Sequence, residues 1–150
     1  MITTKNIEQM LSDEGFIIST VQGRSMLPML TQGKERILIV PPVFPLKLNT
    51  VALYKVNGVY VLHRVIGFEP EGYLIRGDNT VVDEHVKESK VLGMLSGFWR
   101  GEEYIECTEE FNAEMAARSK KTLPYRKVKH FFYDVKYRLA KFKNRLLRKK

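Results

Sequence analysis

The dipeptide Asn57-Gly58, which lies between two runs rich in β-branched residues, constrains the fold more than any other feature of this sequence. Asn and Gly both tolerate positive φ, so the pair favours the type I′ turn of a two-residue β-hairpin. Such a turn sets the register of the antiparallel strands expected at residues 50–56 and 59–66. Ala52 should then face His63 on one side of the pleat. Because the neighbours on that side are largely apolar, we expect His63 to be partly desolvated and neutral at pH 7.

Short β-rich runs separated by turn residues continue from residue 16 to residue 107. Outside the hairpin we predict strands at residues 16–21, 36–40, 73–76, 91–97 and 104–107, and a solvated loop around His85. The spacing of Ile7, Met10 and Leu11 predicts a short helix over residues 4–14. The sequence therefore predicts a mainly β fold in three parts: an N-terminal helix (1–15), an antiparallel β domain (16–107), and an acidic linker with a basic amphipathic helix (108–150).

The composition excludes several classes of protein. With 150 residues, 44% of them hydrophobic, the chain is long enough for one domain with its own core. A single cysteine, Cys107, excludes an internal disulfide and a multi-cysteine zinc site, and we expect no metal and no cofactor. No apolar run approaches the ~20 residues of a membrane span, and the N-terminus lacks the apolar core of a signal peptide. We therefore expect a cytoplasmic protein that does not span a membrane.

Ser25 lies in a tight turn directly after the first predicted strand, with a glycine two residues before it and a proline three residues after it. Such turns are common, but this one can leave the hydroxyl exposed and aim backbone N–H groups at a developing oxyanion. A serine hydroxyl needs a general base to act as a nucleophile. His63 is the natural candidate, because His85 lies among charged residues and His130 lies in the basic tail.

A third segment, Gly77-Asp78-Asn79, follows a predicted strand and precedes Asp83 and Glu84. An Asp in such a turn often binds its own backbone. It can instead orient an imidazole and stabilise the cation that forms during proton transfer. From the residues alone, both roles are open for Asp78.

Taken in order, these three segments resemble the motifs of type I signal peptidases, and the first is shared with LexA-like self-cleaving repressors. The resemblance covers residues 21–97. It implies an irregular assembly of antiparallel β-sheets and a serine endopeptidase that cleaves signal-like or leader-like peptide segments. Ser25 would be the nucleophile, with its backbone N–H in the oxyanion hole. His63 would be the base, as in the branch of the family that has His where most bacterial enzymes have Lys.

The same resemblance implies a carboxylate partner for His63 without settling which one. Asp78 matches the family's Gly-Asp-Asn box, whereas His-branch enzymes carry two further Asp residues, the second of which completes a Ser-His-Asp site. Here those two positions are Asp83 and Glu84, so Asp78, Asp83 and Glu84 all remain candidates.

The resemblance also implies peptide or precursor-protein substrates that pair edge-on with a strand, and we expect Met26, Leu27 and Pro28 to line the groove that holds them. Because the acidic box differs from the family's pattern, a catalytically inactive peptide-binding module on the same fold is the alternative.

The C-terminal tail carries most of the positive charge. Residues 120–150 contain 13 Lys/Arg and one acid, whereas the rest of the chain has 12 Lys/Arg and 16 Asp/Glu. Apolar residues recur there at steps of three and four, which predicts one helix face made of Val128, Phe131, Phe132, Val135, Leu139, Phe142 and Leu146. We expect this face either to pack on the β domain or to bind an anionic membrane peripherally, with the protein acting as a membrane-surface adaptor. The aromatics share the apolar stripe, which argues against nucleic acid.

Overall fold

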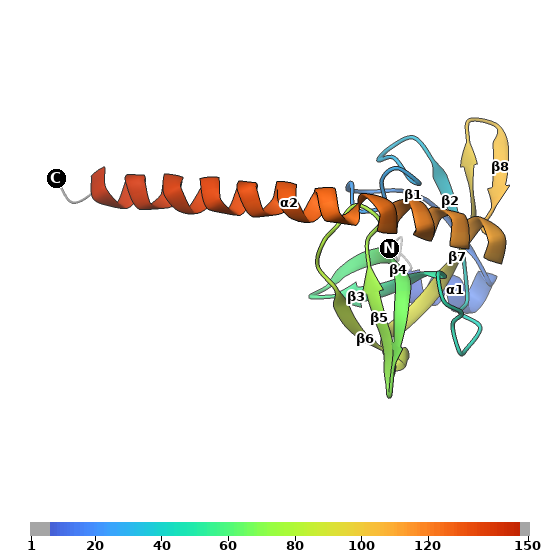
Figure 1. Ribbon diagram of the computed structural model, residues 1–150. Coiled ribbons are helices and arrows are strands. Elements are labelled where there is room, and N and C mark those ends of the chain that lie inside the picture. Colours follow the sequence, from blue (N-terminus) through green and yellow to red (C-terminus); the bar gives the residue numbers. More distant parts are fainter. Residues whose placement is uncertain (1–6, 148–150) are drawn as a thin grey trace, which may run out of the picture.

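The computed structural model describes residues 7–147 of the chain, and the side chains of residues 7–141. The elements in order are α1 (Ile7–Glu14), β1 (Ile17–Thr20), β2 (Arg36–Val40), β3 (Val51–Val56), β4 (Val59–Glu69), β5 (Gly72–Arg76), β6 (Glu84–Lys87), the 3-10 turn η1 (Glu88–Lys90), β7 (Val91–Arg100), β8 (Glu103–Glu106) and α2 (Glu109–Leu147). The strands form an antiparallel sheet in the order β1-β2-β7-β3-β4-β5-β6, with β8 paired to β7 (Figure 1). The mainly β fold with a short N-terminal and a long C-terminal helix is confirmed. Residues 4–6 of the predicted first helix lie outside the described residues.

The predicted hairpin is confirmed together with its register. In the β3–β4 ladder Ala52 pairs with His63 and Val56 pairs with Val59, around a turn in which Asn57 has a φ of 49°. Register shifts interrupt the β2–β7, β3–β7 and β4–β5 ladders, and such bulges bend the strands that contain them. The buried apolar residues form two clusters, and those beside His63 belong to the smaller one, which is formed by Leu46, Ala52, Tyr54, Val65, Tyr73, Ile75, Val86 and Val91.

The expectation of a loop around His85 is wrong, because residues 84–87 form strand β6 against β5. Only Val86 of this strand is buried, and the other three residues are charged or polar. So short and polar a segment has little strand propensity of its own, and it is held by pairing with β5. This pairing sets Glu84 opposite Ile75, two strands away from His63.

Helix α2 begins directly after Thr108, so the acidic segment expected as a linker from residue 108 instead forms the first turns of the helix, while strand β8 matches the strand predicted at residues 104–107. The Thr108 hydroxyl accepts a hydrogen bond from the Phe111 N–H (3.2 Å), which is an N-cap, and Glu109 and Glu110 occupy the first turn. The first turns lie across the β domain (Figure 1), where Asn112 and Ser119 are buried. The helix then continues through Pro124 to Leu147.

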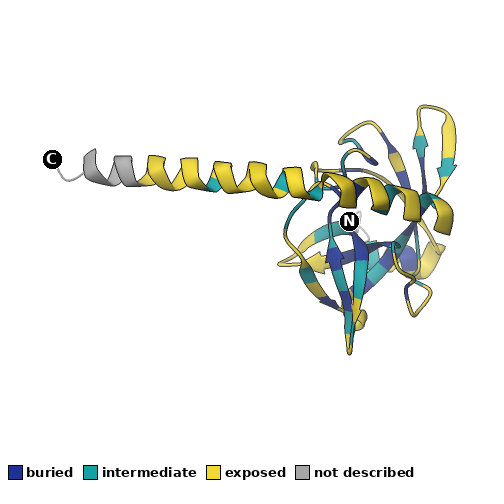
Figure 2. Cartoon of the chain, viewed as in Figure 1, coloured by how far each residue is buried: buried dark blue, intermediate teal, exposed yellow. Residues whose placement is uncertain are grey.

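Beyond Arg126, helix α2 projects away from the β domain, and its surface is exposed almost throughout (Figure 2). Val128, Phe131, Phe132 and Leu139 each keep more than half of their surface exposed, and Val135 keeps 37%. The alternative in which this face packs on the β domain is therefore wrong for residues 128–139. The other two predicted members of the face, Phe142 and Leu146, lie beyond the described side chains. No helix within the described residues is long and apolar enough to cross a membrane.

Candidate active site

His63 and Glu84 form the centre of the site. His63 lies on β4 and is 7% exposed, and its Nδ1 atom is 2.9 Å from Oε1 of Glu84 on β6. The Tyr54 hydroxyl, from the neighbouring strand β3, is 3.0 Å from the same Nδ1 and also hydrogen-bonds to Glu84. The carboxylate accepts from both groups, so it holds the imidazole with its Nε2 atom directed away from Glu84.

Burial determines the protonation states at this centre. Desolvation lowers the pKa of His63 below its ordinary value of 6.5, although the charge of Glu84 and its hydrogen bond oppose that shift. Desolvation likewise raises the pKa of Tyr54, so that side chain stays a neutral donor. The pKa of His63 therefore shifts in the predicted direction, which favours the neutral imidazole. With its Nδ1 proton donated to Glu84, His63 carries a free lone pair on Nε2, as a general base requires.

Gly77 makes room for the imidazole. Arg64 pairs with Arg76 in the β4–β5 ladder, so the next residue, Gly77, lies opposite His63. A Cβ atom at Gly77 would be 2.9 Å from His63 Nε2 and 2.8 Å from the Ser25 carbonyl oxygen, closer than real Cβ contacts allow. The Ser25 backbone and the Nε2 edge of the imidazole thus border the same small space, which any larger residue at position 77 would fill.

Ser25 is half-buried in a turn that is fixed from both sides. The Asn79 N–H donates to the Ser25 carbonyl (2.7 Å), and the Asn79 side-chain amide donates to the Arg24 carbonyl (3.0 Å). On the other side, Met26 and Met29 are each 2% exposed in the larger core cluster. The Ser25 turn and His63 therefore lie close together beside the segment Gly77-Asp78-Asn79, which hydrogen-bonds to the turn through Asn79.

The three candidate carboxylates have three different partners. Glu84 contacts His63, whereas both oxygens of Asp78 accept hydrogen bonds from Arg64, at 2.7 Å from Nε and 2.6 Å from a terminal nitrogen. Asp83 pairs with Arg76 at 2.9 Å. Asp78 still affects His63 through its charge, which raises the pKa of that imidazole by less than Glu84 does. The structure thus assigns the orienting contact to Glu84.

The residues expected to line a substrate groove differ in accessibility. Met26 is buried in the core and therefore serves packing, so the expectation that it lines a groove is wrong. Leu27 is half-buried and Pro28 is exposed. These two side chains remain accessible next to Ser25.

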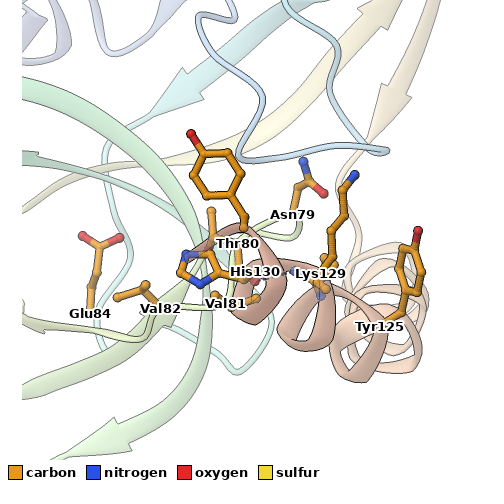
Figure 3. A pocket seen from close by; sticks show the side chains of 10 residues that line it. Asn79, Thr80, Val81, Val82, Glu84, Tyr125, Lys129 and His130 are labelled. Carbon is orange, nitrogen blue, oxygen red and sulfur yellow. Dashed lines mark hydrogen bonds between the residues drawn. The ribbon is translucent and has the colours of Figure 1, made fainter. Parts of the chain in front are cut away.

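A cavity of about 630 Å³ lies beside Glu84, between the loop before β6 and helix α2 (Figure 3). Its lining surface is largely apolar and comes from residues 79–82 and Glu84 on one side, and from Tyr125, Arg126, Lys129, His130 and Tyr133 on the other. Arg126 ties the two walls together by donating to the carbonyl of Thr80. Glu84 lines this cavity and also contacts His63, so the cavity lies next to the residue that holds the imidazole.

Sequence reasoning did not single out Tyr54, Arg64 or Arg126. The hairpin register could have found Tyr54, since it places that side chain on the same side of the pleat as His63, one alternate position further along β3. For Arg64 and Arg126 no local signal exists, because their acceptors Asp78 and Thr80 lie 14 and 46 residues away in the chain.

Within the described part of the chain, no group of three His, Cys, Asp or Glu side chains is placed to hold a metal ion. No model of a protein family matches this chain, and no curated protein matches it either.

Proposed function

We propose that this protein is a serine peptidase of the signal peptidase and LexA type, with Ser25, His63 and Glu84 as its catalytic residues. One observation carries the proposal. The buried, neutral imidazole of His63 is held by Glu84 at Nδ1, and its Nε2 borders the same space as the Ser25 backbone. A carboxylate, an imidazole and a serine in this order are the parts of a Ser-His-acid site, which is recognised by geometry and role and not by chain order.

The proposed reaction transfers an acyl group twice. Oγ of Ser25 attacks the scissile carbonyl carbon while its proton passes to Nε2 of His63. The imidazolium, stabilised by Glu84, gives this proton to the leaving amine as the C–N bond breaks, and the acyl group remains as an ester on Ser25. Water, deprotonated by His63, then attacks the ester and releases the carboxylic acid, which restores the free hydroxyl.

The cavity beside Glu84 is the proposed position for part of the substrate. Its lining is largely apolar, and aromatic side chains of α2 form one wall, which suits an extended peptide with apolar side chains. Signal-like and leader-like segments have this character, so they are the proposed substrates. The helix that forms the wall lies outside the stretch on which the family resemblance depends.

Incubating the full-length protein with a peptide library prepared from a bacterial proteome tests the peptidase function. We expect new peptide ends that accumulate with time, because a neutral base beside Ser25 can activate its hydroxyl. The same preparation of Ser25→Ala should release none of them. Mass spectrometry of the products checks both results and reports the residues that flank the cleaved bond.

Two outcomes would contradict the peptidase. Equal release by wild type and Ser25→Ala would show that another group or a contaminant cleaves. If wild type releases no new ends but retains library peptides on a column of immobilised protein, the inactive peptide-binding module is correct instead.

Replacing Tyr133 with Ala should raise KM about tenfold and leave kcat within a factor of about two, because it removes an aromatic wall of the cavity without touching the reacting groups. Steady-state kinetics on a peptide found in the library experiment would measure both constants. Tyr137→Ala is the matched control, since Tyr137 lies one turn further along α2, outside the cavity lining, with similar exposure (60% against 69%). A KM that changes equally in both variants would place the substrate elsewhere.

A further inference from the structure

The projecting part of α2 presents a continuous apolar face to solvent. Val128, Phe132, Val135 and Leu139 follow one another at steps of four, three and four, which places them on one side of a helix. Phe132 and Leu139 keep 66% and 64% of their surface exposed. Burying such large apolar side chains is favourable, so this exposed face indicates a surface that binds a partner.

Positive charges flank this face on both sides. At 100° per residue, Lys129 and Lys136 lie along one edge of it, and Lys127 and Arg138 lie along the other. Residues 125–141 contain six Lys/Arg and a single acid, Asp134. The long side chains of Lys and Arg can keep their charge at the level of lipid headgroups while the apolar face lies deeper.

The position of α2 leaves this face accessible along its whole length. Residues 127–141 extend as a single rod beyond the β domain (Figure 1), for about 20 Å at 1.5 Å per residue. The cavity is lined by the adjacent side of the helix, which includes Arg126 and Tyr133 and shares Lys129 with one edge of the apolar face. Contact through the apolar face would therefore not use Arg126 or Tyr133, which line the cavity.

We propose that residues 127–141 of α2 lie in the surface of an anionic lipid bilayer, with Val128, Phe132, Val135 and Leu139 inserted below the headgroups. The combination of a narrow apolar stripe, aromatic side chains and cations along both edges is the pattern of a helix that lies in the membrane interface. The negative charge of the headgroups complements the five Lys/Arg side chains of residues 127–141.

Two other occupants fit these observations less well. A second copy of the same helix would bring the two sets of cations together, which costs free energy through like-charge repulsion. Nucleic acid would require aromatics interleaved with the cations for base stacking, whereas here the aromatic Phe132 belongs to the apolar stripe.

Sedimentation of the full-length protein with lipid vesicles tests the proposal and needs no peptidase activity. The protein should pellet with vesicles of equimolar phosphatidylcholine and phosphatidylglycerol, and much less with phosphatidylcholine alone. Phe132→Gln should weaken this binding about tenfold, because an inserted aromatic ring is lost. Lys136→Gln should weaken it about fivefold, and added salt should weaken it further.

Tyr137→Gln is the matched control for Phe132→Gln. Tyr137 has similar exposure (60%) but lies on the opposite side of α2, so its replacement should leave vesicle binding unchanged. Gln is a good helix former, and circular dichroism can check that both variants keep their helix content.

The proposal would be overturned by equal binding of the Phe132 and Tyr137 variants, or by the absence of binding to the anionic vesicles. It would also be overturned if the wild-type protein did not bind vesicles but formed a concentration-dependent dimer that Phe132→Gln abolished. Binding to duplex DNA in place of vesicles would point to nucleic acid. None of these results depends on whether Ser25 is catalytic, so the membrane proposal and the proposed peptidase function are tested independently.

Discussion

Glu84→Gln is expected to lower kcat by roughly 10⁴-fold, the size of effect found when the acid of a Ser-His-acid site becomes an amide. Glu84 accepts from Nδ1 of His63, and Gln could present an N–H there instead, which would favour the wrong tautomer. The charge that stabilises the imidazolium would also be lost. Steady-state kinetics on a peptide found in the library experiment would measure the change.

The same substitution should lower the pKa of His63 further. Burial already holds that pKa below 6.5, and Glu84 is the main group that raises it, so removing the carboxylate removes the opposing effect. The titration midpoint of the His63 ring protons, followed by NMR against pH, should therefore move to lower pH in Glu84→Gln. This measurement requires no substrate.

Asp83→Asn is the control for Glu84→Gln. The two acids are adjacent in the chain, and both pair with a basic side chain, but Asp83 binds Arg76 and is 42% exposed at its side chain. Its amide variant should keep kcat within a factor of about three and leave the His63 titration unchanged. If Asp83→Asn loses activity and Glu84→Gln does not, Asp83 is the residue that orients the imidazole.

The fold could be predicted wherever local chemistry determined it. The Asn57-Gly58 turn was sufficient for the β3–β4 register, and with it the side of the sheet on which His63 lies. The β6 strand could not be predicted in this way, because one buried valine among charged residues carries no strand signal. The sequence contains the capping residue Thr108, but the acidic residues that follow it are equally typical of a linker, so the start of α2 could not be predicted from them.

The site could be predicted as a set of segments but not as a set of contacts. The order of the three segments, together with the family resemblance, singled out Ser25, His63 and three carboxylates. Which carboxylate reaches His63 depends on β6 pairing with β5, a contact between neighbouring strands that the charged sequence of β6 conceals. The cavity depends on the middle of α2 lying against the loop at Thr80, where Arg126 bonds to a carbonyl 46 residues earlier in the chain.

Asp78→Ala is expected to lower the free energy of unfolding by about 3 kcal/mol, at the lower end of the range for breaking a buried ion pair. Arg64 and Asp78 form a bidentate pair, with side chains only 1% and 3% exposed. Removing the carboxylate leaves the guanidinium buried without its counter-charge. The cost stays near the lower end because the carbonyl of Asn49 (2.8 Å) still accepts from Arg64. Urea unfolding followed by fluorescence would measure the difference.

Asp83→Ala offers the same chemical change at a partly exposed pair, and it should cost only about 0–1 kcal/mol. A double variant, Arg64→Met with Asp78→Ala, should be more stable than Asp78→Ala alone, because no buried charge remains unpaired. Two results would contradict this explanation: Asp78→Ala and Asp83→Ala unfolding at the same urea concentration, or the double variant being the least stable of the three. Either would show that the unpaired buried charge of Arg64 does not account for the loss of stability in Asp78→Ala.

The position of Asp78 explains why this pair matters for the site. Its carboxylate holds Arg64, the residue after His63, and its carbonyl accepts a hydrogen bond from Ser119 of α2. Its chain neighbours are Gly77, which leaves room for the imidazole, and Asn79, which holds the Ser25 turn. Loss of the Asp78 carboxylate should therefore loosen β4, the serine turn and α2 together. Asp78 thus connects the three segments of the sequence pattern and has a structural role. The acid that bonds to the imidazole is a different one, Glu84 of β6.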